Sequence, residues 1–277
     1  MINATLKRYQ EKFPHYLEFF EILQQIHLLR KTHDKLWSKD IFSFDRRMAA
    51  RKLAANKPLI NLQHDPFDDE MPRHYFLDLL TVAENTHPDA VENLRKTIST
   101  DITTYTEMVR KLFSKTEKSS TGAPASTDKP EEYFDLITFF LHQSLKPFFS
   151  QLALKSKDLF EKQMWTQGVC PICSQTPDLS LLRNEEGNRS LFCLQCDFEW
   201  PYKRLQCHYC GNEDQRLLSY FTVEGPDQDR YRVNVCNHCQ RFIKTIDTRK
   251  MNQEIDLEIE NLITIHLDLE AAKEGFH

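Results

Sequence analysis

The feature that most constrains this chain is a set of four Cys-x-x-Cys pairs within 70 residues. The pairs are Cys170-Pro-Ile-Cys173, Cys193-Leu-Gln-Cys196, Cys207-His-Tyr-Cys210 and Cys236-Asn-His-Cys239, and no cysteine occurs in the first 169 residues. Two thiolates separated by two residues in a tight turn can reach one ion, and two such turns complete a tetrahedral S₄ site. Four pairs therefore predict two metal ions, each held by four cysteines.

The order of the pairs leaves two ways to share them between the ions. Nineteen residues separate the first pair from the second and twenty-five separate the third from the fourth, and each gap contains a hairpin signal. This favours a sequential assignment, in which Cys170, Cys173, Cys193 and Cys196 bind one ion and Cys207, Cys210, Cys236 and Cys239 bind the other. An interleaved assignment, first pair with third, stays open. Zinc and iron both accept four thiolates, so the spacing does not choose the metal.

Disulfide and redox chemistry are the competing interpretations of these cysteines. The N-terminal residues lack the apolar stretch of an export signal, and no window has the roughly 18 consecutive apolar residues of a membrane span. We therefore expect a cytoplasmic protein, whose thiols stay reduced. Thioredoxin-like chemistry uses one Cys-x-x-Cys at the start of a helix, whereas these pairs lie among hairpin signals. An S₄ site has no open coordination position, which favours a scaffold for a binding surface over a reactive metal.

The charge of the cysteine region argues against nucleic acid as the partner. Between residues 165 and 250 eleven basic residues oppose eleven acidic ones, and the whole chain carries a formal charge of −5. Phosphate binding requires a positive field, and each divalent ion with four thiolates adds a net −2. The chain also lacks the phosphate-loop, nucleophile-elbow, His-Glu-x-x-His and dinucleotide-binding patterns. We expect neither nucleic-acid binding nor enzymatic activity.

Several side chains near the cysteines have a structural interpretation. His208 and His238 lie inside the pairs, but each ion already has four cysteines, so we expect both imidazoles to be exposed rather than ligands. His266 falls on the apolar side of a C-terminal helical pattern and is expected in the core. Trp200 and Phe198 are expected to pack against the metal-binding ribbon.

The rest of the chain predicts an α+β fold with a helical N-terminal domain. Apolar residues recur with the helical period at 16–30, 44–55, 75–85, 90–113 and 133–162, and Pro147 should kink or interrupt the last stretch. Strands are expected at 179–183, 189–193, 217–223, 231–235 and 241–247. We therefore predict a helical domain at 1–165 with a mobile loop at about 114–130, two tandem rubredoxin-like (zinc-ribbon) β modules at 166–202 and 203–250, and a C-terminal helix at 251–277.

The four pairs and their flanking residues resemble the formate dehydrogenase accessory proteins of the FdhE family. The flanking residues are Trp200, Arg204, Gly211-Asn212, Tyr220 and Phe242-Ile-Lys244. The resemblance extends to the helix ending in 266–276, to the N-terminal helix at 16–25 and to the loop at 57–59, and it leaves out residues 114–130. Ser174 stands where the family commonly has glycine, which affects the geometry of that turn.

The resemblance implies a cytoplasmic, non-enzymatic maturation factor or chaperone. Such a protein binds the catalytic subunit of a molybdenum- or tungsten-dependent formate dehydrogenase and assists its assembly before export or activation. The resemblance also implies rubredoxin-like sites for iron or zinc. Two other classes stay open: a redox or sulfur-relay protein with reactive Cys-x-x-Cys cysteines, and a nucleic-acid-binding zinc ribbon. Neither the oligomeric state nor the surface that meets the partner follows from the sequence.

Overall fold

The computed structural model describes residues 2–114, 131–160, 165–224, 229–250 and 255–277. The helices are α1 (Ile2–Lys12), α2 (Leu17–Thr32), α3 (Arg46–Ala54), α4 (Glu70–Leu79), α5 (Pro88–Thr100), α6 (Thr103–Ser114), α7 (Glu131–Phe160), α8 (Leu257–Ile263) and α9 (Ile265–Lys273). The strands are β1 (Leu179–Arg183), β2 (Asn188–Cys193), β3 (Phe198–Pro201), β4 (Leu218–Phe221), β5 (Tyr231–Cys236) and β6 (Arg241–Asp247). Short 3₁₀ turns lie at Pro14–Tyr16, Asp34–Leu36, Leu80–Ala83, Gln215–Leu217 and Thr248–Lys250. Most of the loop predicted at 114–130 lies outside the described residues.

The N-terminal helices follow the predicted apolar periodicity. Phe20, Leu23 and Ile26 recur on one face of α2 and are buried there. The Asp45 carboxylate caps α3 by accepting a 2.7 Å hydrogen bond from the amide of Met48, which satisfies one of the free donors at a helix start. The predicted helices at 16–30, 44–55 and 75–85 therefore correspond to α2, α3 and α4 with its following 3₁₀ turn.

Two helical predictions need correction. The single helix expected at 90–113 is two helices, because Asp101 is extended and its carboxylate accepts a 2.9 Å hydrogen bond from the amide of Thr103, which starts α6. The C-terminal helix is also two helices, with Thr264 between them donating its hydroxyl to the carbonyl of Glu260 at 2.7 Å. Pro147 lies inside α7, which continues from Glu131 to Phe160, so of the two expected effects the interruption does not occur and the kink stays a prediction.

All six strands form one continuous sheet in the order β3-β2-β1-β6-β5-β4. Each half is an antiparallel meander, and the two halves meet where β1 pairs parallel to β6, with Leu179 opposite Lys244 and Leu182 opposite Asp247. The predicted β modules thus share one sheet, because the inner strand of each half supplies the other with a pairing edge.

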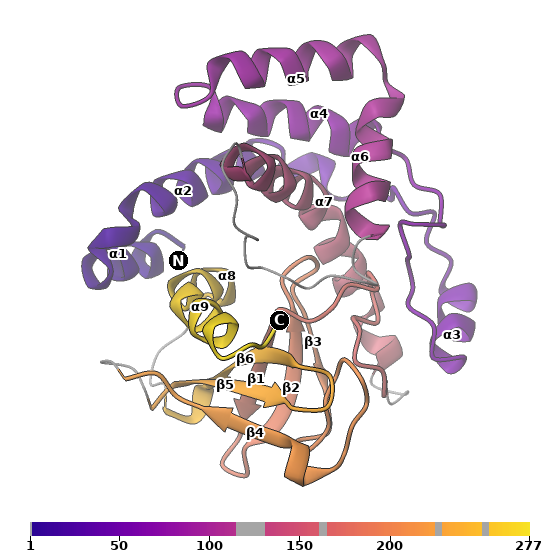
Figure 1. The fold of residues 1–277 in the computed structure, drawn as a ribbon. Coiled ribbons are helices and arrows are strands. Elements are labelled where there is room, and N and C mark those ends of the chain that lie inside the picture. The colour runs from indigo at the N-terminus through magenta and orange to yellow at the C-terminus, as the bar shows by residue number, and fades with distance from the viewer. Residues whose placement is uncertain (1, 115–130, 161–164, 225–228, 251–254) are drawn as a thin grey trace.

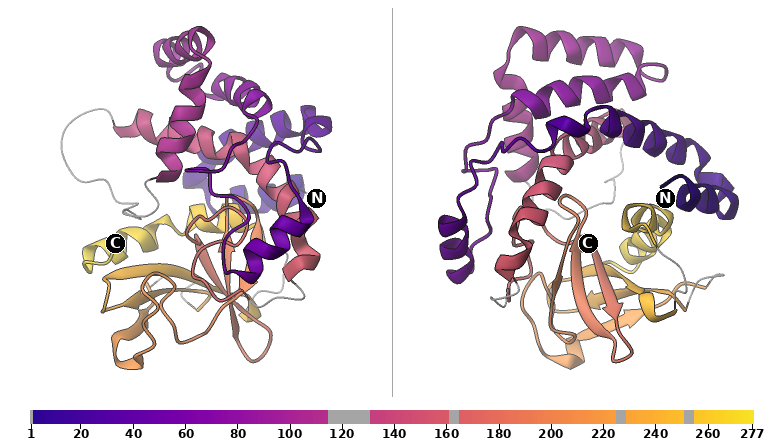
Figure 2. Two further views of the ribbon diagram at one scale, coloured as in Figure 1. Left: turned by 90° about the vertical axis from the view of Figure 1, so that its right-hand side faces the viewer. Right: turned by 180° about the vertical axis from the view of Figure 1, so that it is seen from behind.

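The helices and the sheet form layers with the C-terminal helices between them. Figures 1 and 2 show α8 and α9 lying between the N-terminal helices and one face of the sheet. Ile259 and Ile263 of α8 pack against Leu6 and Phe20, whereas Leu267 of α9 packs on the sheet. The largest core cluster runs from the helical layer into the first cysteine pairs. The first two Cys-x-x-Cys pairs are therefore part of the same hydrophobic core as the helices.

Candidate metal centres

Each Cys-x-x-Cys turn ends in a residue with left-handed backbone. These residues directly follow the second cysteine of each pair and are Ser174 (φ 63°), Asp197 (φ 54°), Gly211 (φ 72°) and Gln240 (φ 57°). In three turns the amide of this residue donates to the carbonyl of the first cysteine: 3.1 Å for Ser174, 3.0 Å for Gly211 and 2.8 Å for Gln240. The left-handed residue closes the turn, which explains why a glycine is favoured at the position of Ser174.

The first and second pairs come together in a fully enclosed cluster. The sulfur atoms of Cys170 and Cys196 lie 3.3 Å apart. The sulfur atom of Cys173 lies 3.5 Å from that of Cys193 and 3.9 Å from that of Cys196. No side chain of this cluster exceeds 1% exposure. We call these four residues the inner cluster.

The third and fourth pairs form a second cluster nearer the surface. The sulfur atoms of Cys207 and Cys239 lie 3.7 Å apart, and those of Cys210 and Cys236 lie 3.8 Å apart. Cys207 and Cys236 are buried, Cys239 is half-buried and Cys210 is exposed. We call these four residues the outer cluster. The first pair thus groups with the second and the third with the fourth, as in the sequential assignment. Among the described residues the structure does not group the first pair with the third, as the interleaved assignment would require.

Both clusters fit a metal ion with four thiolate ligands. A tetrahedron with metal–sulfur bonds of about 2.3 Å has sulfur–sulfur edges of about 3.8 Å, close to the separations found here. A disulfide would need about 2.05 Å. Burial and the neighbouring sulfur atoms raise the pKa of Cys173 and Cys196 well above the usual thiol range. Four thiolates so close together require a cation, and a tetracoordinated zinc or iron ion would supply that charge.

The inner cluster is joined to the helical layer by main-chain and side-chain hydrogen bonds. The amides of Leu59 and Ile60 donate to the carbonyls of Pro171 and Ile172 at 2.8 and 2.9 Å, so the 57–60 loop lies along the first turn. On the second turn, the Gln195 amide group donates to the carbonyl of His142 in α7 at 3.1 Å. An ion here would therefore fix the sheet to the helices.

A charged network continues this contact. Lys146 of α7 lies 3.0 Å from Asp197, which follows the second turn, and 3.4 Å from Glu258 of α8. Gln143 also donates to Glu258 at 2.7 Å. Burial opposes the charge on Glu258, but Lys146, His27 and Arg30 outweigh burial and hold its pKa below the usual carboxyl range. The sequence did not predict this network, whose one local signal is Lys146 beside the apolar residues Leu145 and Phe148.

The prediction for Trp200 holds, because this side chain is 2% exposed and lies in the core cluster that includes the inner cysteines. Phe198 instead packs on Phe160 of α7, with 4.8 Å between ring centroids, and two histidine predictions were wrong. His238 is exposed as expected. His208 is buried, because its main chain lies against Gly168, where an added Cβ would stand 1.8 Å from the His208 carbonyl oxygen. His266 is exposed, because the break at Thr264 turns its neighbour Leu267 toward the sheet instead.

The fold and the clusters define a class of protein: an α+β protein whose single sheet carries two tetracysteine clusters, one enclosed by helices and one near the surface. Among the described residues, no helix has the length and apolar character needed to cross a bilayer. Comparison with known proteins shows what the chain is similar to.

Similarity to FdhE proteins extends along nearly the whole chain. The FdhE homologue of Aquifex aeolicus is 28% identical over 274 residues, covering 96% of this chain and 88% of that protein. The homologue of Actinobacillus pleuropneumoniae (serotype 3) is 26% identical over 168 residues, 58% of this chain and 54% of that protein. The crystal structure of the FdhE protein from Pseudomonas aeruginosa matches 99% of this chain and 90% of that chain with a TM-score of 0.68 at 20% identity, which shows a shared fold. No family model matches. The predicted resemblance to FdhE is confirmed.

Proposed function

We propose that this chain is a cytoplasmic accessory factor that binds the catalytic subunit of a molybdenum- or tungsten-dependent formate dehydrogenase and assists its assembly before export or activation. The observation that carries the proposal is the similarity to the FdhE homologue of Aquifex aeolicus over 96% of the chain. The site chemistry agrees with a non-enzymatic role. Four cysteines saturate a tetrahedral ion and leave no position for a substrate.

In this proposal the eight cysteines hold two ions of zinc or iron with different roles. The ion of the inner cluster stabilises the joint between the helical domain (1–165) and the first β module (166–202). The ion of the outer cluster, in the second module (203–250), shapes surface turns. Structural metal binding contributes directly to folding free energy when the site does not exist in the unfolded chain.

The outer cluster offers the surface that would meet the partner. Its turns expose Cys210, Asn237 and His238, and the last residue lies beside them, because the amide of His277 donates to the carbonyl of Gln240 at 2.8 Å. A rigid turn fixed by a metal loses little entropy on binding, which makes it a good recognition element. We infer that the fourth Cys-x-x-Cys turn contributes to docking.

Co-purification tests this function. Tagged chain, co-expressed with the catalytic subunit of the formate dehydrogenase from the same host, should retain that subunit through size-exclusion chromatography. His238→Glu should weaken the association, whereas Lys96→Glu, an exposed residue of α5 in the helical layer, should not. Absence of association with both metal sites filled would contradict the proposal.

One observation favours a second candidate function, a redox or sulfur-relay protein. Cys210 is exposed and Cys239 is half-buried, so a reagent can reach the outer cluster. If these thiols react during function, a mild two-electron oxidant should oxidise Cys210 and Cys239 to a disulfide, or an added polysulfide should transfer a sulfane sulfur to one of them as a persulfide and leave as the polysulfide shortened by one sulfur. Either reaction should release one metal. The accessory role instead predicts slow alkylation and unchanged metal content.

A further inference from the structure

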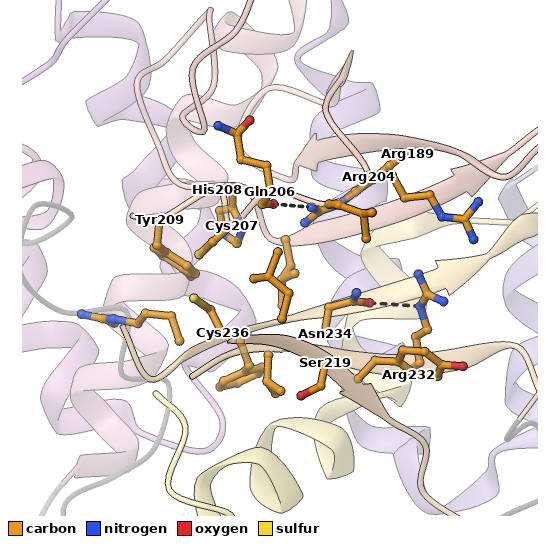
Figure 3. A pocket seen from close by; sticks show the side chains of 17 residues that line it. Arg189, Arg204, Gln206, Cys207, His208, Tyr209, Ser219, Arg232, Asn234 and Cys236 are labelled. Carbon is orange, nitrogen blue, oxygen red and sulfur yellow. Dashed lines mark hydrogen bonds between the residues drawn. The ribbon is translucent and has the colours of Figure 1, made fainter. Parts of the chain in front are cut away.

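A cavity beside the outer cluster is lined by arginines. Its volume is about 180 Å³, and it lies between the third Cys-x-x-Cys turn and strands β4, β5 and β6. Arg189, Arg204, Arg232 and Arg241 line it, and no aspartate or glutamate of the described residues does. Figure 3 shows these side chains with the neighbouring Gln206, His208 and Asn234. The cavity walls therefore carry a strong local positive charge in a chain that is acidic overall.

Among the described residues, three of these arginines lack the ion-pair partner that nearby arginines have. Each nearby arginine pairs with a carboxylate at 2.7 Å: Arg183 of β1 with Glu199 and, in the 3₁₀ turns next to the sheet, Arg216 with Asp214 and Arg249 with Asp247. Within the described ranges, no carboxylate forms an ion pair with Arg189, Arg204 or Arg232. Their hydrogen bonds go to neutral acceptors instead: Ser180 and two carbonyls for Arg189, the carbonyl of Glu186 for Arg204, and Asn234 for Arg232.

Arg189, the most buried of the three, is a charged side chain in the protein interior. Arg189 is only 8% exposed, and burial lowers its pKa to about 10. Burial and repulsion by Arg204 also lower the pKa of Arg232. A guanidinium group in such a place is costly unless an anion accompanies it. An anion seated between these groups would remove that cost.

The outer cluster by itself does not account for all three arginines. A filled S₄ site carries a net −2, and the cluster sulfurs border the cavity. Figure 3 shows the sulfur atoms of Cys207 and Cys236 at one end of the cavity, however, while the Arg232 guanidinium group, bonded to Asn234, lies at the other. Arg232 also lies over the Tyr220 ring, 4.6 Å from its centroid, so it contacts strand β4 rather than the cluster.

We propose that this cavity is a binding site for a phosphoryl group, free or carried by a small organic molecule. Guanidinium groups form paired, charge-assisted hydrogen bonds to phosphate oxygens. A dianion matches three cations that form no ion pair with a described carboxylate better than a single carboxylate does. The volume fits a phosphoryl group with a small attachment and is below the range of drug-sized ligands. This site does not depend on the accessory role.

Titration of the metal-loaded full-length chain tests this site, using calorimetry in a chloride buffer with inorganic phosphate and, separately, with glycerol 3-phosphate. Both probes should saturate one site per chain, with acetate much weaker. Tighter binding of the ester would assign an organic carrier, and equal or tighter binding of phosphate would assign the free ion. Arg204→Gln and Arg232→Gln should each weaken binding about tenfold or more. Arg216→Gln is the matched control, because this arginine is 87% exposed in its side chain and already paired.

Metal content measured on each variant separates anion binding from support of the cluster. Retained metal with weakened phosphate binding in Arg204→Gln, whose side chain is exposed, supports the site even if the Arg232 variant folds poorly. Absence of saturable binding of either probe by the metal-loaded wild type would overturn the proposal. Unchanged binding in both arginine variants would overturn it as well.

Discussion

At the scale of single residues, backbone conformation limits which amino acids can close a Cys-x-x-Cys turn. Only one of the four left-handed positions is glycine; the others are Ser174, Asp197 and Gln240. A residue with a Cβ atom costs about 1–2 kcal/mol in this conformation. The chain tolerates that cost at three turns because other contacts compensate; for example, Asp197 accepts a hydrogen bond from Ser150 at 2.8 Å.

Substitution of Gly211 should measure this backbone cost directly. An added Cβ would meet no atom within 4 Å, so Gly211→Ala changes conformational preference without a steric clash. We expect Gly211→Ala to destabilise the chain by about 1 kcal/mol. Gly211→Asn should cost less, because asparagine adopts the left-handed region more readily. Chemical denaturation of the metal-loaded variants measures both, and equal losses would show that conformation is not the cause.

The two clusters should respond differently to loss of one ligand. Cys173→Ser removes a fully buried ligand of the inner cluster, so the chain should lose one metal and its melting temperature should fall by more than about 10 °C. Cys210→Ser removes an exposed ligand and should cost the other metal while the helical layer stays folded. Metal analysis with circular dichroism distinguishes the two. Equal thermal effects would contradict the assignment of an inner and an outer role.

At the scale of elements, helix α7 connects the second Cys-x-x-Cys turn to α8. It carries His142, Lys146 and Ser150, which contact the second turn, and Gln143 and Lys146 contact α8. Removing one partner of a buried ion pair is costly, because the other charge stays buried without compensation. Glu258 is the best place to test the connection, since its side chain is 17% exposed and its pKa is lowered by Lys146.

Glu258→Gln should destabilise the chain by about 3 kcal/mol at pH 7. The folded-state pKa of Glu258 lies below its unfolded value near 4.5, so the stabilisation is fully present above pH 4.5. It is lost as the pH falls from there toward the folded-state pKa. Denaturation of both proteins between pH 7 and pH 3.5 should show a constant difference that begins to shrink below about pH 4.5.

Glu270→Gln is the matched control for this experiment. Glu270 pairs with Lys273 one helical turn away, and both side chains are more than a third exposed. Exposed pairs contribute about 0–1 kcal/mol, so this variant should stay close to the wild type throughout. A pH-independent difference for Glu258→Gln would mean that its carboxylate charge does not stabilise the fold.

The elements also show what the sequence predicts and what it does not. Local signals sufficed for the two hairpins, for the apolar face of α2 and for β6, whose bounds agree with the predicted strand. The break at Thr264 was not predicted, because a threonine hydroxyl that bonds Glu260 looks like any other helical residue in sequence. Because of that break, the prediction of a buried His266 was wrong. His208 is placed by a main-chain contact with Gly168, forty residues earlier in the chain. Contacts between distant segments leave no local signal.

At the scale of the whole molecule, the two predicted β modules are not independent. The parallel pairing of β1 with β6 joins them into one sheet, and Leu267 of α9 shares one buried cluster with residues of both halves, including Leu181 and Val233. The chain ends are also joined, because the hydroxyls of Tyr9 in α1 and Tyr231 in β5 both donate to the buried carboxylate of Glu260 in α8. We therefore expect the inner cluster to unfold with the rest of the molecule.

Stepwise metal removal tests whether the two clusters are metal centres with separate roles. Chain purified without oxygen should carry two ions of zinc or iron by native mass spectrometry. A mild chelator should remove one ion from the outer cluster, with little change in circular dichroism. The second ion should leave only as the chain unfolds. A chain without bound metal, or one that loses both ions together while staying folded, would contradict the account.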